Sequence, residues 1–274
     1  MNSDDYRAYV GGTSGLIYGY VNDGFYTVAD FEPFDSKSRS WKLKEGVVDS
    51  SPLSDTPRPG NAKFKKLTPV DPNSTNPYQL TEADRTVIGN TTPKFSGGFG
   101  LNATYKGFDM SMFFNFMYDF DVLNANKIML TTWADNKENN FLMNIASDKR
   151  WRNFDDMGNE IRYSPEVLAE FNKNATMWNP TSIGRPICMS YAVEDGSFLR
   201  LNSATLGYTL PSVWTKKVGL SKVRFYVSGN NLFTLTGYSG YDPEVNIATG
   251  LTPNIDYNRY PRSRTYTFGA QLTF

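Results

Sequence analysis

The final stretch TYTFGAQLTF, residues 265–274, alternates polar and apolar side chains without a break and ends on an aromatic residue. A β-strand points successive side chains to opposite faces, so this stretch predicts one strand with an apolar face and a polar face. Its ten residues match the roughly 9–11 that a tilted strand needs to cross a bilayer. Termini of soluble proteins tend to fray, so a terminal Phe274 on the apolar face favours a strand held in a lipid-facing barrel wall.

Other segments alternate in the same way. Residues 95–105 and 108–118 are separated only by Lys106 and Gly107, which predicts a β-hairpin with a tight turn. A further strand is expected over residues 223–235. The side chains expected to face the membrane are Phe108, Met110, Met112, Phe114, Val223, Phe225, Val227, Tyr266, Phe268, Leu272 and Phe274.

Three segments give weaker or mixed signals. Residues 197–210 resemble a strand, but the parity of the apolar side chains changes within it, and a β-bulge would reconcile the two halves. Residues 16–26 are rich in Tyr, Ile, Val and Phe and predict a strand. Residues 167–172 predict a short helix after Ser164-Pro165-Glu166.

Long and short connections alternate along the chain. The connections over residues 27–94, 119–196 and 236–259 are long, whereas 106–107 and 211–222 are short. Outer-membrane barrels have short periplasmic turns and long extracellular loops. The sequence therefore predicts an all-β, antiparallel transmembrane β-barrel segment, with the long loops outside and extra β-ribbon within them.

The composition excludes several classes of function. The 28 basic and 28 acidic residues cancel, which argues against a nucleic-acid surface. The chain has no histidine, so Ser-His and Cys-His catalysis and the commonest metal ligand are absent. One cysteine, Cys188, allows neither an internal disulfide nor a cysteine-rich zinc site. We expect no enzyme and no transmembrane helix, since no run of about 18 apolar residues occurs.

Several strings resemble the C-terminal part of the SusC/RagA family of TonB-dependent outer-membrane transporters, which import oligosaccharides or peptides. They are collinear and extend over nearly the whole chain. They are IYGYVNDGF at residues 17–25, DRTVIGN at 84–90, YKGFD at 105–109, DGSFLRL at 195–201, LGYTLP at 206–211, GNNLFT at 229–234, YSGYDPE at 238–244 and the terminal strand.

The resemblance implies a 22-stranded barrel that is plugged by an N-terminal domain and lidded outside by a SusD-like lipoprotein. Neither the plug, the TonB-contacting segment nor a signal peptide has a counterpart in this chain. We therefore expect residues 1–274 to be a single unit, the C-terminal barrel portion of such a transporter, in the bacterial outer membrane. The implied partners are the lid, the TonB complex through the missing N-terminal part, an oligosaccharide or peptide, and outer-membrane lipid, but no nucleic acid.

Aromatic and acidic residues in two of the long loops are candidates for substrate contact. They are Trp133, Trp151, Trp178, Tyr238, Tyr241, Asp242 and Glu244. The alternative for the tryptophans is that they pack the core of their own loop. The alternatives for Asp242 and Glu244 are a hydrogen-bonded proline turn or an acid–base pair.

A calcium candidate lies in the loop before Arg85. Asp71, Asn73 and Glu82 have oxygen side chains at spacings that a calcium loop uses. An Asx-rich turn is the alternative explanation. We expect no other cofactor.

Two other functions remain open. The apolar stripes would also suit the core of a soluble extracellular β-sandwich, which would make the chain a carbohydrate-binding module. A glycosidase with paired carboxylates at Asp242 and Glu244 is the third hypothesis.

Overall fold

The computed structural model describes residues 3–54, 56–132, 142–145, 149–245, 252–257 and 260–274. Its dominant element is one antiparallel sheet of five long strands in the order β13-β11-β10-β7-β6. These strands are β6 (Phe95–Tyr105), β7 (Phe108–Tyr118), β10 (Phe198–Thr209), β11 (Lys222–Thr236) and β13 (Thr265–Thr273). All five were predicted from alternation, and their ends differ from the predicted ones by a single residue at most.

The register of this sheet places the alternating apolar side chains on one face. Ala103 lies opposite Met110, Met110 opposite Leu206, Leu206 opposite Val227 and Val227 opposite Phe268. Directly opposed residues of an antiparallel pair point to the same side of the sheet. One row of apolar side chains therefore crosses all five strands, and the rows above and below it repeat the pattern.

The predicted bulge in β10 is confirmed. The register shifts between Leu201 and Ser203 on both sides of the strand. As a result Leu201 lies opposite Phe114 and Ala204 lies opposite Met112, and these two β7 side chains share a face. The extra residue of the bulge thus keeps both halves of β10 in phase with the apolar face.

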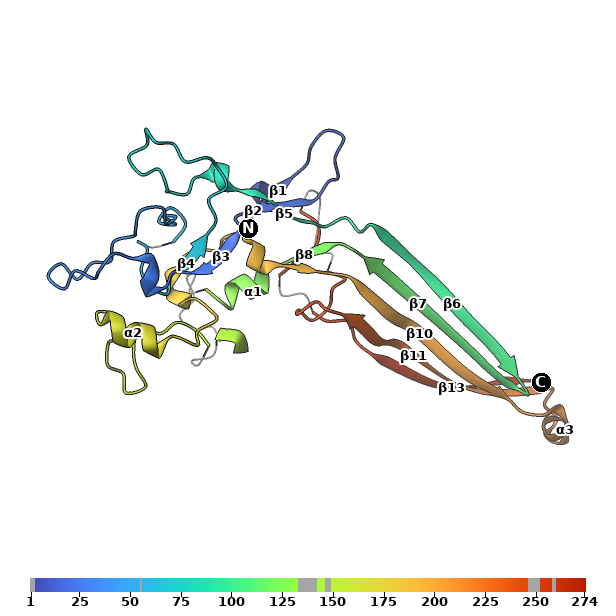
Figure 1. Ribbon diagram of the computed structural model, residues 1–274. Coiled ribbons are helices and arrows are strands. Elements are labelled where there is room, and N and C mark those ends of the chain that lie inside the picture. Colours follow the sequence, from blue (N-terminus) through green and yellow to red (C-terminus); the bar gives the residue numbers. More distant parts are fainter. Residues whose placement is uncertain (1–2, 55, 133–141, 146–148, 246–251, 258–259) are drawn as a thin grey trace.

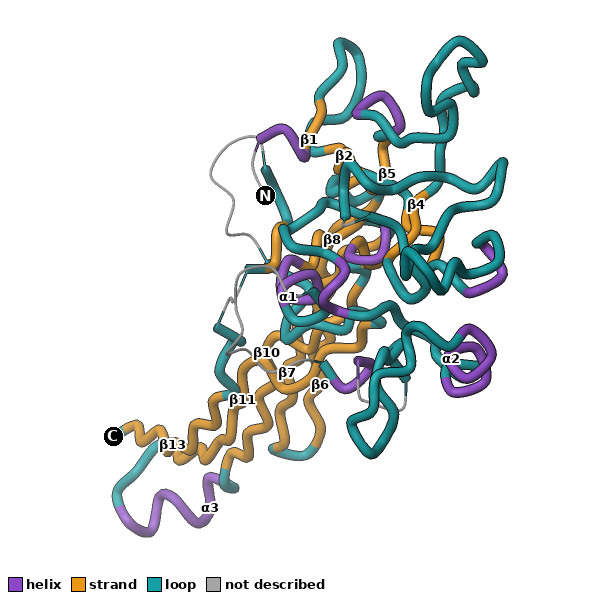
Figure 2. Tube along the Cα trace, turned by 90° about the vertical axis from the view of Figure 1, so that its left-hand side faces the viewer, coloured by secondary structure: helices purple, strands orange, loops and turns teal. Residues whose placement is uncertain are grey.

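The connections are segregated as the sequence predicted. The hairpin turn at Lys106 and Gly107 and the turn that carries α3 (Ser212–Thr215) lie at one end of the sheet, near the C-terminus (Figure 1). The three long connections gather at the other end and form a separate mass of chain, which we call the loop body (Figure 2).

Short elements organise the loop body. Its sheets are β1 (Tyr6–Arg7) with β2 (Leu16–Gly19) and β5 (Thr86–Asn90), β3 (Asn22–Phe25) with β4 (Ala62–Phe64), and β8 (Asp121–Asn124) with β9 (Val193–Asp195) and β12 (Ile255–Asp256). Its α-helices are α1 (Ala125–Met129) and α2 (Pro165–Phe171), and it also holds 3-10 helices at Ser3–Asp5, Val28–Asp30, Glu82–Asp84, Met143–Ile145, Pro180–Ser182 and Ser190–Ala192. The predicted helix after Ser164 is α2, and the expected extra β-ribbon is present.

The segment 16–26 differs from its prediction. It forms two short strands in different sheets, because the chain breaks at Tyr20. The Tyr20 amide donates to the Cys188 carbonyl, and the Ser190 amide donates to the Tyr20 carbonyl. The prediction of one strand over this segment was therefore wrong, and tertiary pairing with residues 188–190 is the reason.

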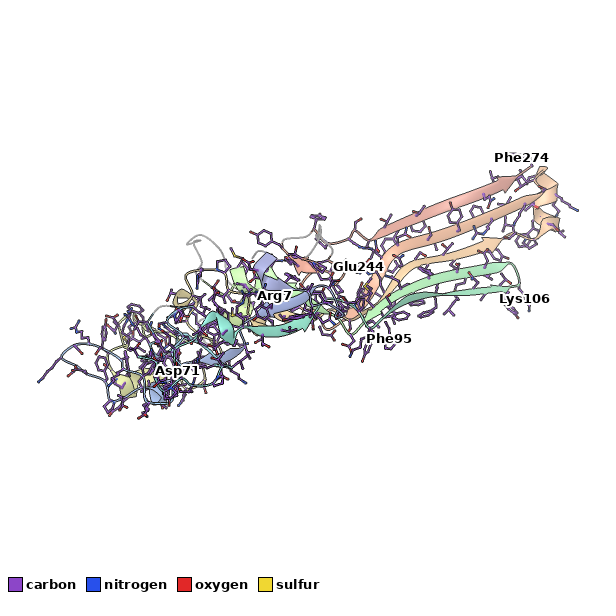
Figure 3. The ribbon with its side chains drawn as sticks, turned by 90° about the horizontal axis from the view of Figure 1, so that it is seen from above. Arg7, Asp71, Phe95, Lys106, Glu244 and Phe274 are labelled. Atoms are coloured by element: carbon purple, nitrogen blue, oxygen red, sulfur yellow. The ribbon has the colours of Figure 1, made fainter. Side chains whose placement is uncertain are left out.

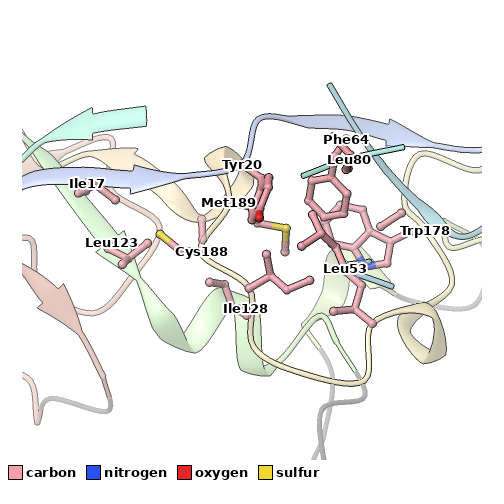
Figure 4. Close-up of a cluster of buried hydrophobic side chains, with 14 of the residues drawn as sticks. Ile17, Tyr20, Leu53, Phe64, Leu80, Leu123, Ile128, Trp178, Cys188 and Met189 are labelled. Atoms are coloured by element: carbon pink, nitrogen blue, oxygen red, sulfur yellow. The ribbon is translucent and has the colours of Figure 1, made fainter. Parts of the chain in front are cut away.

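The loop body has its own apolar core. One cluster buries Ile17, Phe64, Leu80, Trp178 and Met189, and its buried members come from residues 6–80 and 123–192 (Figure 4). Full burial of such a side chain stabilises a fold by roughly 1.5–3 kcal/mol. Among the described residues, no helix has the length and apolarity to cross a bilayer.

Candidate functional site

The apolar face of the five-stranded sheet is open to its surroundings. Phe268 and Phe274 are 81% and 89% exposed, and Leu272 is 51% exposed. The sheet extends away from the loop body, and no described part of the chain packs a second layer on it (Figure 3). The interior of a soluble β-sandwich is thereby excluded for these three side chains in this structure. A large exposed apolar face of this kind marks a membrane or protein contact.

The candidate membrane-facing side chains share that face. The strand register places every candidate within a strand on the apolar face. Phe274, which follows the last strand, belongs to the same face by alternation. Val223 is the exception in exposure, because it is buried near the end of β11 that α3 contacts. Contact of this face with lipid remains a prediction.

The opposite face of the sheet is polar and carries an ion pair. Arg224 of β11 donates through Nε to Asp109 Oδ1 of β7 at 2.9 Å, and its Nη2 lies 2.5 Å from Asp109 Oδ2. The pair crosses the intervening strand β10 over Gly207, which has no side chain. A Cβ atom on Gly207 would lie 2.4 Å from Arg224 Nη2 and 2.6 Å from Asp109 Oδ1. A bidentate arginine–carboxylate pair of this type is a strong polar contact.

Asp242 and Glu244 are engaged by arginines. Arg200, which projects from β10 and is only 2% exposed, places Nη2 2.5 Å from Asp242 Oδ1 and Nη1 3.3 Å from Glu244 Oε2. Arg262 Nη2 lies 2.8 Å from Glu244 Oε1. Asp242 Oδ1 also accepts from the Glu244 amide at 2.9 Å, as the predicted turn requires. This geometry favours an anchor between the loop and the sheet over an acid–base pair.

The two tyrosines of the same loop differ in exposure. Tyr238 is buried and donates through its hydroxyl to Asp256 Oδ2 at 2.6 Å. Burial and this hydrogen bond raise the pKa of Tyr238 above its ordinary value. Tyr241 is 82% exposed, so it is the member of the pair that a substrate could reach.

The described tryptophans of the 119–196 connection are packed inside the loop body. Trp178 is 2% exposed, and its Nε1 donates to the Thr131 carbonyl at 3.2 Å. Trp151 is 3% exposed and lies against Phe25, with ring centroids 5.7 Å apart. These positions favour the packing alternative, while contact with a substrate remains a prediction. Trp133 lies outside the described residues.

Two of the three calcium candidates, Asp71 and Asn73, form an Asx turn. Asp71 Oδ1 accepts from the Asn73 amide at 2.9 Å, and the Asp71 carbonyl accepts from the Ser74 amide at 3.1 Å. Glu82 lies in the first turn of a 3-10 helix and is exposed. Within the described ranges, no three His, Cys, Asp or Glu side chains group closely enough to hold a metal ion. A bound calcium ion stays a prediction.

Asp84, two residues later, is the buried carboxylate of this region. Its two oxygens accept from the Leu67 amide, from the amide and hydroxyl of Thr68, and from the amide and hydroxyl of Thr81, all within 3.0 Å. Lys66 Nζ lies 3.4 Å away. Burial opposes ionisation, but the hydrogen bonds outweigh it, led by those from Thr68, and hold the pKa of Asp84 well below its usual range. In the sequence, Asp84 was noted only as part of the family-like string at residues 84–90, and its role as a buried hydrogen-bond acceptor was not predicted.

The single cysteine is a buried thiol. Cys188 is 5% exposed within the core cluster of the loop body. Burial, with a smaller effect of Asp5, raises the pKa of Cys188 to about 12. A thiol of this kind reacts slowly with electrophiles, because the thiolate is the reactive form.

Comparison with known proteins supplies relatives that match over nearly the whole chain. No protein-family profile matches. A TonB-dependent receptor (P3) of Formosa agariphila is 33% identical over 95% of this chain, and a second one (P26) is 28% identical over 86%. The TonB-dependent receptor SusC of Bacteroides thetaiotaomicron is 38% identical over 31% of it.

Solved structures agree in fold. The RagAB peptide transporter superposes with a TM-score of 0.58 at 22% identity, over 96% of this chain and 23% of that one. The RagAB peptide importer in an open state gives a TM-score of 0.55. The chain spans about a fifth of the length of the curated relatives that it matches over most of its residues, namely 22% of P3 and 22% of P26.

The antiparallel strands, their two-faced register and these relatives together define a class, a strand-built part of a TonB-dependent receptor. Within that class the chain belongs to the SusC/RagA family of TonB-dependent transporters. The resemblance seen in the sequence is thereby confirmed.

Proposed function

We propose that this chain supplies wall strands and extracellular loops to a TonB-dependent importer of nutrients in the bacterial outer membrane. The observation that carries the proposal is the row from Ala103 to Phe268, repeated along the sheet, which gives five adjacent strands one apolar and one polar face. A soluble sheet would bury such a face, whereas a barrel wall turns it toward lipid and turns the polar face toward a watery lumen.

The proposal extends to a closed barrel of 22 strands. Among the described strands, β6 and β13 are each paired on one side only. In hydrocarbon each unpaired backbone group costs several kcal/mol, so both edges require further strands when the sheet is in the membrane. Additional strands of the same barrel would meet that requirement.

The proposed partners follow from the family. A SusD-like lipoprotein would cover the loop body from outside, and the TonB complex would act through a part that precedes this chain. The cargo would be an oligosaccharide or a peptide, and the exposed Tyr241 is a candidate contact for it. We propose no chemical step on the cargo, since Asp242 and Glu244 are each paired with arginine.

Cysteine labelling tests the orientation of the wall. The neighbours Phe225 and Tyr226 of β11 point to opposite faces, which makes F225C and Y226C a matched pair. In outer membranes containing the gene product, a water-soluble maleimide should label Y226C several-fold faster than F225C. The native Cys188 supplies little background because it is buried.

Equal labelling of the two variants would contradict the proposal. If F225C reacts as fast as Y226C in intact membranes, the apolar face is in contact with water and not with lipid. Labelling after solubilisation and unfolding is the control, because both variants must then react equally.

A further inference from the structure

The loop body has a cavity of about 280 Å³ that is lined in part by Leu168 of α2. Helix α2 lies at the end of the loop body far from the long strands (Figure 1). Arg39, Arg58, Arg162, Trp41, Tyr163 and Asn61 are among the side chains that line the cavity. They come from the first long connection and from the one that holds α2. Neither Trp41 nor any of these arginines was singled out by sequence reasoning, because they are far apart along the chain.

This cavity carries an excess of positive charge although the whole chain is formally neutral. Three guanidinium groups line it, and none of the lining side chains among the described residues is a carboxylate. Arg162 pairs with Glu160 through Nε at 2.5 Å, outside the lining. Arg39 and Arg58 form no ion pair with any described residue. The charge is therefore a local feature that an anion would neutralise.

Two of these guanidinium groups contact the same aromatic ring. The guanidinium carbons of Arg39 and Arg162 lie 5.3 Å and 5.8 Å from the centroid of the same Tyr163 ring. Cation–π contacts at these distances are attractive and offset part of the repulsion between like charges. Phe34 links Tyr163 to Trp41, with ring centroids 6.1 Å and 4.8 Å away, so the cations and rings form one assembly.

A second cavity of about 470 Å³ adjoins the first. The two share Asn153, Arg162 and Thr181 in their walls, and the second adds Arg150 and Trp151. Trp151 is 3% exposed, and its buried Nε1 has no hydrogen-bond partner in the described part of the chain. A buried donor without a partner is rare in folded proteins.

Among the described residues in the wall of the second cavity, one carboxylate occurs, and it is already hydrogen-bonded. Asp155 accepts hydrogen bonds from the Met157 amide and from the amide and side chain of Asn159, all within 2.9 Å. These bonds lower the pKa of Asp155, the Asn159 side chain having the largest effect. Asp155 thus stabilises its own turn, and the adjoining cavities keep their excess of unpaired arginine.

We propose that the two cavities bind an acidic oligosaccharide, with a carboxylate or sulfate group held by Arg39 and Arg58. The planar guanidinium fork matches the oxygen pairs of both anions. Amide and hydroxyl side chains, such as Asn61, Asn153 and Thr181, suit sugar hydroxyls, and the rings suit the apolar faces of sugars. Two connected cavities suit a chain of several units. The inference names a cargo class and so rests on the proposed import function, but binding is measured without transport.

Calorimetry on the purified gene product tests this. The probes are a glucuronic acid–glucose disaccharide, its neutral glucose–glucose counterpart, a sulfated disaccharide, inorganic sulfate and a hexaglutamate peptide. An acidic disaccharide should bind at least about tenfold more tightly than the neutral one, and added salt should weaken its binding. R39Q and R58Q should each weaken it about tenfold, since each removes a charged hydrogen-bond donor. K37Q is the matched control, because Lys37 lies in the same loop but outside both cavities.

Several results would overturn the proposal. Equal affinity for the acidic and neutral disaccharides would show that the cavities do not recognise an anionic group. Unchanged binding by R39Q and R58Q places the anion elsewhere, provided that circular dichroism shows both variants folded. If inorganic sulfate binds as tightly as the sulfated disaccharide, the sugar does not contribute to binding. If a hexaglutamate peptide binds more tightly than the acidic disaccharide, the ligand is an acidic peptide and not an oligosaccharide. Failure of the maleimide test leaves these results intact, so the two proposals fail separately.

Discussion

Asp84 illustrates how one side chain organises a long connection. Its buried carboxylate accepts five hydrogen bonds within 3.0 Å from residues 67, 68 and 81. It therefore ties two segments of a loop that has little regular secondary structure. The neighbouring Arg85 extends the arrangement, since its Nη2 donates to the Tyr18 carbonyl at 2.7 Å and lies 2.9 Å from Asp5 Oδ1. An irregular loop gains a defined shape from such buried, fully used acceptors.

Replacing Asp84 with asparagine should loosen this loop at neutral pH. The folded pKa is lowered, so the stabilisation is present above the unfolded value of about 3.9 and is lost as the pH falls toward the folded one. Loss of charged hydrogen bonds costs roughly 1.5–3 kcal/mol. Hydrogen exchange of the Leu67, Thr68 and Thr81 amides at pH 7 should accelerate about tenfold or more in D84N.

The exposed Glu82 supplies the control, because E82Q should exchange as the unchanged protein does. Unfolding in acid provides the second check. The difference in stability between D84N and the unchanged protein should shrink as the pH falls below about 4. A difference that stays constant down to pH 2 would show that ionised Asp84 is not the source.

Among the strands, the ion pair on the polar face of the long sheet requires a glycine in the strand that lies between its two partners. Strand β10 lies between β7 and β11, and Gly207 lets Arg224 reach Asp109 across it. The same solution recurs at Gly269 of β13, where a Cβ atom would lie 2.4 Å from the Tyr226 ring. Large side chains on one strand thus lie over glycines on its neighbours.

Substitution of Gly207 by alanine should therefore destabilise the sheet. The new methyl group would displace the ends of both partners of the ion pair, and loss of such a partly exposed pair costs up to about 1 kcal/mol. Thermal unfolding of the purified gene product should show a lower midpoint for G207A. G100A is the matched control, because its added Cβ would meet nothing closer than the Met112 carbonyl at 3.6 Å. Equal midpoints for the two variants would refute the crossing geometry.

The whole molecule consists of a packed loop body and an uncovered sheet (Figure 3). The loop body buries its own core, whereas the sheet exposes Phe268, Leu272 and Phe274 and leaves one side each of β6 and β13 unpaired among the described strands. Exposed apolar faces and open strand edges promote association in water. The molecule as described therefore matches a piece of a larger assembly better than a self-sufficient soluble protein.

Residues 1–274 produced alone in water should accordingly associate. Size-exclusion chromatography with light scattering should find species larger than the 30.9 kDa monomer unless detergent is present. Replacing Phe225, Phe268 and Leu272 together by serine should reduce this association, because it removes apolar area from the exposed face. A monodisperse, cooperatively unfolding monomer without detergent would instead support the soluble carbohydrate-binding alternative.

The amino-acid sequence alone was enough to predict the five long strands, their two faces, the bulge in β10 and the segregation of the connections. Alternation with a period of two is a local property, so it can be read without knowing what a strand pairs with. The family resemblance was likewise readable from collinear strings, of which YSGYDPE at residues 238–244 is one.

The environments of the side chains in the long connections followed from tertiary contacts that the sequence did not predict. The tertiary structure buried Trp151 and Trp178, paired Asp242 and Glu244 with arginines, broke the segment 16–26 at Tyr20 and gathered Arg39, Arg58 and Arg162 around one cavity. These contacts join residues up to more than a hundred positions apart and follow no period. The side chains of a loop acquire their environment from distant segments, and single-sequence patterns carry no record of which segments those are.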